Sequence, residues 1–316
     1  MAFFLALDVG GTKTDYVLAD ESCVLARVRT GSIKRMRTEA TAAAAYLDAG
    51  LAELVASTGV AMSAVSRTCV GTAGNTVPLV TDWLRSELRA RVGGELLVLG
   101  DVDIALDAAF PGEAGVLVLA GTGSNVAGRG TDQRVFTVGG WGPALSDQGS
   151  GHRIGQQALR AVALAHDAGE ANALFEAVLN TWNLRSFDDL VERANALPGP
   201  DVSQLVQTVV RCAAEGDFLA QQVLREQGEE LAAIVLLLLA RLQKISAEPD
   251  FVPSLAFAGS IMEHVPAVRQ ALLKTVRQQF PSARELPGVV DPPLGALWRA
   301  RTGSGFGAAA ADREQR

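Results

Sequence analysis

The chain has 316 residues, more than one hydrophobic core usually supports, so two lobes are expected. Its hydrophobic share of 48% and charged share of 20% exclude a disordered chain and are typical of a globular α/β protein. A formal net charge of −7 argues against nucleic acid or an anionic membrane as a partner, because both attract clustered Lys and Arg. The longest apolar run, 231–240, is shorter than the roughly 20 residues that cross a bilayer.

Cysteine usage points to a reducing compartment. Cys23, Cys69 and Cys212 are odd in number, widely spaced and without a Cys-x-x-Cys pair, so neither a disulfide framework nor a zinc site is predicted. The first residues, FFLALDV, are interpreted as a buried strand and not as a targeting leader. We therefore expect a cytoplasmic location.

Strands and helices alternate along the first third of the chain. The segment Phe3–Leu18 holds two apolar runs on either side of GGTKT, which predicts a strand, a glycine turn and a second strand. Hydrophobic periodicity then predicts a helix over 38–57, a strand over 67–71, a helix over 78–92 and a strand over 95–99.

The N-terminal pattern returns from Gly115 onward as GVLVLAGTGSNVAGRG. Two weakly similar halves predict a duplicated α/β domain whose two turns face each other across a cleft. We expect a first lobe over 1–112 and a second lobe, richer in helix, over 113–290. The elements expected in the second lobe are a strand over 254–258 and helices over 150–168, 171–182, 186–195, 201–213, 217–243 and 263–279.

The last part of the chain has two predicted segments. PPLGALWRA indicates a closing helix within 291–302 that returns to the first lobe. The remaining residues, 303–316, are rich in Gly and Ala before a charged end, and we expect a flexible tail there.

Asp8, Gly10, Gly11 and Thr12 form the first candidate site. The missing side chains of the two glycines let backbone N–H groups approach phosphate oxygens, and Thr12 adds a hydroxyl donor. Asp8 is a candidate for holding hydrated magnesium. A Walker loop is excluded, because that motif leads into a helix and here a strand follows. A plain hairpin turn remains the alternative.

A second turn, Gly121-Thr122-Gly123-Ser124-Asn125, offers the same kinds of donor after an apolar strand. A purely structural hairpin does not require Thr, Ser and Asn between glycines. Two such turns favour a site for nucleotide phosphates.

Asp101 is the candidate general base. It follows the apolar run LLVL, at the carboxyl end of a predicted strand, where open α/β sheets usually bind their ligands. A carboxylate there can accept the proton of an acceptor hydroxyl as a γ-phosphate arrives. A helix cap is the alternative for Asp101, and Asp103 and Asp107 compete with it for the catalytic role.

The loop GGWGPALSDQGSGHRIG, residues 139–155, is a candidate ligand loop. It places Trp141 between glycines and Asp147 ahead of a helix predicted to begin near Gly149. Glycines around one aromatic and one carboxylate side chain suit a ligand with many hydroxyls. The alternatives are a packing role for Trp141 and a helix cap for Asp147.

Five motifs in order resemble the BadF/BadG/BcrA/BcrD-type ATPase family and, within it, N-acetylglucosamine kinases: LDVGGTKTD, AGTGSN, GGWGPALSDQGS, FAGSI and DPPLGAL. The resemblance spans nearly the whole chain, and GGWG followed closely by DQGS is its most specific part. It implies an α/β fold with two ribonuclease-H-like lobes, of the actin/hexokinase type, around ATP and magnesium. It also implies phosphorylation of a hydroxyl of an amino sugar, with N-acetylglucosamine converted to its 6-phosphate.

The resemblance assigns roles to individual residues. Asp101 is implied as the base and Asp8 as the residue that holds Mg²⁺ through water. The residues implied to bind the nucleotide are Gly10, Gly11, Thr12, Lys13, Thr122, Ala213, Gly259 and Ser260. The residues implied to bind the sugar are Asp101, Ser124, Asn125, Gly140, Trp141, Gly142 and Asp147.

One departure from the family pattern concerns the acceptor sugar. These kinases usually carry an Asn after the second strand, and the segment TGSIKRMRT has none. Ser32 and Lys34 are the candidates to replace it. A basic residue suits glucosamine less well than a neutral or acidic sugar such as N-acetylmuramic acid. Kinases for glucosamine and for N-acetylmuramic acid are the alternatives.

Two other classes of protein remain open. An ATPase that activates a radical dehydratase or reductase needs an iron–sulfur cluster, and the three cysteines fall in none of the matching motifs. A non-catalytic sugar sensor would bind ligand without consuming ATP. Whether the chain is a monomer or a homodimer is left open, with the homodimer as the expectation.

Overall fold

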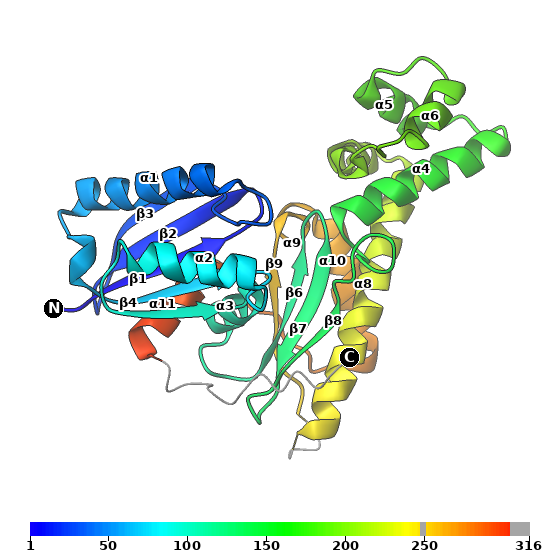
Figure 1. The fold of residues 1–316 in the computed structure, drawn as a ribbon. Helices are drawn as coiled ribbons and strands as arrows, with labels where there is room; N and C mark the ends of the chain where they lie inside the picture. Colours follow the sequence, from blue (N-terminus) through cyan, green and yellow to red (C-terminus); the bar gives the residue numbers. More distant parts are fainter. Residues whose placement is uncertain (247–250, 304–316) are drawn as a thin grey trace. The chain divides into compact units, whose positions relative to one another are not determined.

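The computed structural model describes residues 1–246 and 251–303, and the chain divides into two compact units (Figure 1). Unit 1 comprises 1–115, 129–135 and, at the end of the chain, the residues from 290. Unit 2 comprises 116–128 and 136–289. The segment 129–135 fell inside the predicted second lobe. The predicted tail, 303–316, lies outside the described residues apart from Gly303.

Unit 1 is built on a five-stranded sheet in the order β3-β2-β1-β4-β5. The strands are β1 (Phe3–Val9), β2 (Lys13–Ala19), β3 (Val24–Gly31), β4 (Val65–Thr72) and β5 (Glu95–Leu99). β1 runs antiparallel to β2 and parallel to β4, and β4 runs parallel to β5. The carboxyl ends of β1, β4 and β5 therefore share one edge of the sheet with the β1–β2 turn.

Successive side chains of β1 point to opposite faces of this sheet, and helices cover both faces. Leu5 and Leu7 pack with α1 (Ala40–Thr58) and α2 (Pro78–Arg89), whereas Phe4 and Ala6 pack with α3 (Asp101–Ala109) and α11 (Pro292–Thr302). A short 3-10 helix, η1 (Met62–Ala64), precedes β4.

The contact between α3 and α11 is unusually close. A Cβ placed on Gly295 of α11 would lie 1.8 Å from the carbonyl oxygen of Ile104 in α3. On its other side, the Ile104 side chain would lie 2.1 Å from a Cβ on Gly71 of β4. Glycine at these two positions lets β4, α3 and α11 stack with almost no space between them.

Unit 2 has a four-stranded sheet in the order β8-β7-β6-β9, with β6 parallel to β9. The strands are β6 (Gly115–Ala120), β7 (Ser124–Arg129), β8 (Val135–Gly139) and β9 (Leu255–Ala258). The helices are α4 (Gly151–Asp167), α5 (Ala173–Trp182), α6 (Phe187–Ala194), the 3-10 helix η2 (Val202–Leu205), α7 (Val206–Ala214), α8 (Phe218–Ile245), α9 (Ser260–His264) and α10 (Pro266–Gln279). α8 packs against α4, α7 and α10 and supplies much of one continuous core.

Most predicted elements agree with the structure to within a few residues, and two strands were missed. β3 and β8 are outer strands of their sheets, and several of their residues, apolar ones included, are exposed. The helix predicted over 201–213 begins as η2, and the helix predicted over 263–279 starts at Pro266, after the separate α9.

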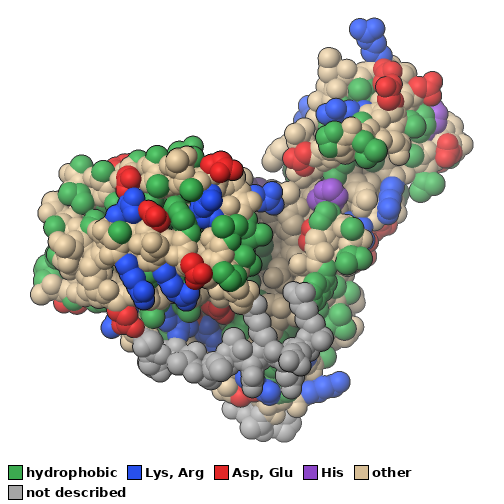
Figure 2. Space-filling view, in the orientation of Figure 1, with side chains coloured by type: hydrophobic (Ala, Val, Ile, Leu, Met, Phe, Trp, Pro, Cys, Tyr) green, Lys and Arg blue, Asp and Glu red, His purple; other side chains and the backbone are tan. Residues whose placement is uncertain are grey.

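The surface shows mixed charge. On the face drawn in Figure 2, Lys and Arg side chains are interspersed with Asp and Glu side chains. Within the described ranges, none of the helices is both long enough and apolar enough to span a bilayer.

Gly295→Ala is expected to lower the free energy of unfolding by about 1–3 kcal/mol, because the added methyl group overlaps the Ile104 carbonyl. This net loss should appear although alanine gains about 1 kcal/mol over glycine in a helix. Chemical denaturation measures it. Thr302→Ala, at an exposed position of the same helix, is the control and should stay within about 0.5 kcal/mol of wild type. A Gly295→Ala protein as stable as wild type would contradict the close contact.

Candidate active site

The β1–β2 turn is held in shape from both sides. The Gly10 amide donates to the Lys13 carbonyl at 3.0 Å, which closes the turn. The buried Ser32 hydroxyl donates to the Gly10 carbonyl at 2.7 Å and accepts from the Lys34 amide at 3.1 Å. The proton of Ser32 is therefore used to fix the turn, while Gly11 and Thr12 are exposed.

Asp8 lies at the carboxyl end of β1, partly buried beside this turn. Burial, together with the negative charges of Asp101 and Asp15, raises the pKa of Asp8 to about 7, and Lys13 opposes the shift. A carboxylate in such surroundings gains from a nearby cation, so Asp8 fits a hydrated magnesium ion. No group of three or more His, Cys, Asp or Glu side chains suited to a metal occurs among residues 1–246 and 251–303.

The first two acids of α3 have different surroundings. Gly100 is the N-cap residue, and the Asp103 carboxylate accepts a hydrogen bond from its amide at 3.0 Å. Asp101 is the first helical residue, is partly exposed, and accepts from the Val102 amide at 3.0 Å. The helix-cap alternative for Asp101 is therefore wrong, because Asp103 supplies the capping carboxylate.

Asp107, the third acid of α3, is fully buried. Its two oxygens accept hydrogen bonds from Arg129 Nη2 at 2.6 Å and from Arg299 Nε at 2.9 Å. Both oxygens are taken up by guanidinium groups, so Asp107 is unsuited to accept a substrate proton. Asp101 is partly exposed, and its carboxylate is engaged neither in the helix cap nor in an ion pair that the structure shows.

In unit 2, the glycine turn between β6 and β7 is anchored by the start of α4. The Gly121 amide donates to the Gly123 carbonyl at 2.9 Å, which closes the turn. The amides of Gly151 and His152 donate to the carbonyls of Gly121 and Thr122 at 2.7 and 3.2 Å. With its carbonyls held by α4, this turn leaves the Thr122 side chain exposed.

Asp147 is buried against the same turn in an uncommon backbone conformation. Its φ is +67°, in the left-handed region, and its carboxylate accepts from the Ser124 amide at 3.2 Å. The Ser124 hydroxyl donates to the Gln148 carbonyl at 2.7 Å. The helix-cap alternative for Asp147 is wrong, because Ser150 is the N-cap residue. Strain of this kind is found most often at functional sites.

The glycines of the loop let it approach Asn125 closely and expose Trp141. Gly140 and Gly142 have φ values of +73° and +84°, and a Cβ on Gly140 would lie 3.0 Å from Asn125 Cγ. Asn125 Oδ1 is buried without a hydrogen-bond partner in the described part of the chain. The Trp141 residue is 60% exposed, which contradicts a packing role in the core.

The predicted adenosine residues lie in two places within unit 2. Gly259, with φ +92°, lets the β9–α9 turn pass close to Ala120, and the Ser260 hydroxyl lies near Gly121. Ala213 lines a cavity of about 470 Å³ formed by residues of α7, α8 and α10 and by Val265, just after α9. The lining is mainly apolar, and its polar members are Gln221, Gln270, Arg225 and Lys274.

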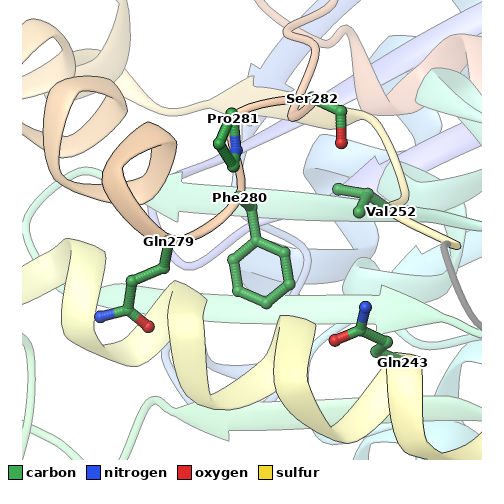
Figure 3. A pocket seen from close by; sticks show the side chains of 6 residues that line it. All are labelled: Gln243, Val252, Gln279, Phe280, Pro281 and Ser282. Atoms are coloured by element: carbon green, nitrogen blue, oxygen red, sulfur yellow. The ribbon is translucent and has the colours of Figure 1, made fainter.

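A second hollow, of about 440 Å³, lies where α8 and α10 end (Figure 3). Its lining residues are Gln243, Val252, Gln279, Phe280, Pro281 and Ser282. Phe280 lies between the two glutamine side chains in the close-up view. None of the predicted site residues lines it, so we assign it no part in the candidate site.

Sequence reasoning missed the residues that support the site from a distance. The Gln227 side chain, buried in α8, accepts a hydrogen bond from the Gly149 amide at 3.1 Å and so holds the loop after Asp147. Gln227 stands 78 positions after Gly149, and nothing in its helical neighbourhood distinguishes it. Pairs this far apart carry no local signal.

Comparison with known proteins gives a consistent result. A family model described as the BadF/BadG/BcrA/BcrD ATPase family matches residues 5–299. The N-acetylmuramic acid/N-acetylglucosamine kinase of Clostridium acetobutylicum is 26% identical over 314 residues, which cover 96% of this chain and 99% of that protein. The N-acetyl-D-glucosamine kinase of Dictyostelium discoideum is 26% identical over 310 residues, which cover 93% of this chain and 96% of that protein.

Solved structures share the fold. A proposed N-acetylglucosamine kinase from Chromobacterium violaceum superposes with a TM-score of 0.70 at 24% identity, covering 94% of this chain and 98% of that chain. At this identity the likeness concerns the fold alone. Together with the strand order, it confirms the predicted α/β class with two ribonuclease-H-like lobes of the actin/hexokinase type.

Asp8→Asn is expected to stabilise the metal-free protein at pH 8 by about 1–3 kcal/mol, because it removes an unfavourable charge. The pKa of Asp8 is raised from 3.8 to about 7, so between these values the folded state holds more protons than the unfolded state. Wild-type stability therefore falls as pH rises through that window, and the advantage of asparagine grows from pH 4 to pH 8. Urea denaturation at both pH values measures the difference.

Asp20→Asn is a control for which the expected change in the free energy of unfolding has the opposite sign. Hydrogen bonds from Cys23 and Ser22 lower the pKa of Asp20 to about 2, so its charge stabilises the folded state above pH 4. This replacement should destabilise the protein at pH 8. A stability gain from Asp8→Asn that did not change with pH would contradict the raised pKa.

Proposed function

The chain belongs to the BadF/BadG/BcrA/BcrD ATPase family, and from that premise we propose that it is an ATP-dependent kinase acting on a hydroxyl of an amino sugar. The proposed acceptor is N-acetylglucosamine and the product its 6-phosphate. Glucosamine and N-acetylmuramic acid are the alternative acceptors. The observation that carries the proposal is the match to curated kinases over nearly the full length of both chains.

The glycine turns at Thr12 and Thr122 are the proposed phosphate-binding segments of the chain. The exposed hydroxyls of Thr12 and Thr122 and the amides of the turns donate to phosphate oxygens, and Lys13 adds positive charge. Asp8 holds magnesium through water, and the ion, when bound, neutralises the charge of the phosphates. The raised pKa of Asp8 supports this role, because a cation restores the charged form.

The adenosine part of ATP occupies unit 2. The mainly apolar cavity at Ala213 suits the faces of an adenine ring, and the amides of the glutamines that line it suit the ring nitrogens. Gly259 and Ser260, which lie beside the second glycine turn, contact the sugar or phosphate of the nucleotide.

The acceptor sugar is bound by the loop that holds Asp147. Trp141 offers an exposed aromatic face for the apolar side of a pyranose ring, and Gly140 and Gly142 let the loop backbone come close to it. The unpartnered Asn125 oxygen accepts a hydroxyl proton of the sugar. Ser124 acts as an acceptor, since its own proton is held by the Gln148 carbonyl.

Asp101 is the proposed general base. Its carboxylate takes the proton of the attacking hydroxyl while the sugar oxygen forms a bond to the γ-phosphorus and the bond to ADP breaks. Asp103 and Asp107 are engaged in the helix cap and in ion pairs, which supports Asp101 for this role. Most of the rate enhancement comes from positioning and charge neutralisation.

The activator of a radical enzyme is the weaker alternative. A cluster ligand must be a thiolate, and burial raises the pKa of the Cys69 thiol to about 12. Burial also raises the pKa of Cys212, whereas Cys23 is exposed. Cysteines in such different surroundings do not favour a shared cluster.

We extend the proposal to a cytoplasmic homodimer. Three unbonded cysteines suit a reducing compartment. The oligomeric state is tested by the molar mass in solution, for which twice the 33.1 kDa of one chain is expected.

A coupled assay of ADP release tests the kinase activity. The panel of sugars is glucosamine, N-acetylglucosamine, N-acetylmuramic acid, N-acetylmannosamine and glucose. We expect ADP release that depends on an amino sugar, with the highest kcat/KM for N-acetylglucosamine and one phosphorylated sugar per ADP. ADP release without phosphorylated sugar favours the activator, and sugar binding without ADP release favours a sensor.

Asp101→Asn is expected to lower kcat by about 10²- to 10⁴-fold, the usual contribution of a general base, while KM for ATP and sugar stays within a few-fold. Asp103→Asn is the matched control, because asparagine also caps a helix well and should keep kcat near the wild-type value. Steady-state kinetics on both variants give the comparison. Near-normal kcat in Asp101→Asn, or a large loss in Asp103→Asn, would show that the base was assigned to the wrong carboxylate.

A further inference from the structure

Asp107 lies too far from Asp101 to share its chemistry. The two residues stand six positions apart on α3, which places them about 9 Å apart along the helix axis. Asp107 is also fully buried, so it does not meet a substrate. The charge of Asp107 therefore has a structural role inside unit 1.

Two arginines from distant parts of the chain hold the Asp107 carboxylate. Arg129, at the end of β7, is itself 4% exposed and also donates to the Phe110 carbonyl at 3.1 Å, just after α3. Arg299, on α11, donates to Asp107 through Nε and Nη2. The C-terminal end of α3 is thus fastened to Arg129 on one side and to α11 on the other.

The backbone packing of α3 leaves it little freedom to move independently. The Ile104 carbonyl lies against Gly295 of α11, and the Ile104 side chain lies against Gly71 of β4. A rotation of α3 about its own axis would break the ion pairs of Asp107 or force Ile104 into one of these glycines. Figure 1 shows α3 and α11 on the same side of the unit 1 sheet.

Stability alone does not account for two buried charges, Asp107 and Arg129, and a third, Arg299, whose side chain is only 12% exposed. A buried ion pair is worth little more than well-packed apolar residues, since desolvation offsets the attraction. Unlike apolar contacts, hydrogen bonds from two guanidinium groups fix the Asp107 carboxylate in one orientation. A helix fixed in rotation holds the side chain at its first residue in a fixed direction as well.

We propose that Asp107, Arg129 and Arg299 are positioning residues that set the orientation of α3 and thereby aim the Asp101 carboxylate. The inference rests on the proposed function of Asp101 as the base. A displacement of about 1 Å at a reacting group can cost around 10²-fold in rate, so a small rotation of α3 is enough to affect kcat.

Arg299→Met is the variant of choice. It leaves Asp107 paired with Arg129, so no unpaired carboxylate is buried and the protein is expected to fold. We expect kcat to fall about 10-fold or more, with KM for ATP and sugar within about two-fold of wild type. Arg299→Lys, which keeps the charge and one donor, should restore part of kcat.

Arg301→Met is the matched control on the same helix. The Arg301 guanidinium donates to the Asp20 carbonyl at 2.9 and 2.7 Å, so its loss weakens the docking of α11 without touching α3. We expect a similar loss of thermal stability and an unchanged kcat. An equal fall of kcat in Arg301→Met would overturn the inference, because general loosening of α11 would then explain the effect.

A double-mutant cycle with Asp101→Asn completes the test. If Arg299 acts through Asp101, Arg299→Met should not lower kcat further in the Asp101→Asn background. Additive losses, or a normal kcat in Arg299→Met alone, would overturn the inference. Failure of the proposed function looks different, since the wild-type protein itself would then transfer no phosphate to sugar.

Discussion

The shape of each glycine turn depends on how its carbonyl oxygens are hydrogen-bonded. A tight turn presents amides to an anion only if its carbonyls point elsewhere and find donors there. In unit 1 the donor is the hydroxyl of Ser32, which follows β3. In unit 2 the donors are the amides of Gly151 and His152, at the start of α4. The same requirement is met by a side chain in one unit and by a helix start in the other.

Aspartates of unit 1 have different roles because their surroundings differ. Asp107 is fully buried between two guanidinium groups, and its charge is matched. Asp8 is partly buried among other carboxylates, and its charge is unmatched, which its raised pKa records. A protein that held both residues only for stability would have little reason to keep Asp8. The unmatched carboxylate is the one suited to a cation brought by a ligand.

Local patterns predicted most of the fold and much of the candidate site. The glycine turns and long helices have strong periodicity or unusual composition, so they are visible in a single sequence. The apolar residues of β3 (VLARVRTG) and β8 (VFTVG) do not alternate strictly with polar ones, so these two outer strands were missed. Asp101 and Asp103 could not be separated by spacing, because the choice depends on which carboxylate bonds to Gly100. The pairing of Asp107 with Arg299 spans 192 positions, and no local pattern reports it.

The place of α11 in unit 1 has a consequence for synthesis on the ribosome. The face of the unit 1 sheet that holds Phe4 and Ala6 is covered partly by Ala296, Leu297 and Ala300, near the end of the chain. During translation, α11 cannot cover this face until the whole of unit 2 has been synthesised. Through most of translation the nascent chain therefore has α3 but not α11 on this face, and transiently exposed apolar surface of this kind favours aggregation. Premature termination before α11 would leave this face open permanently.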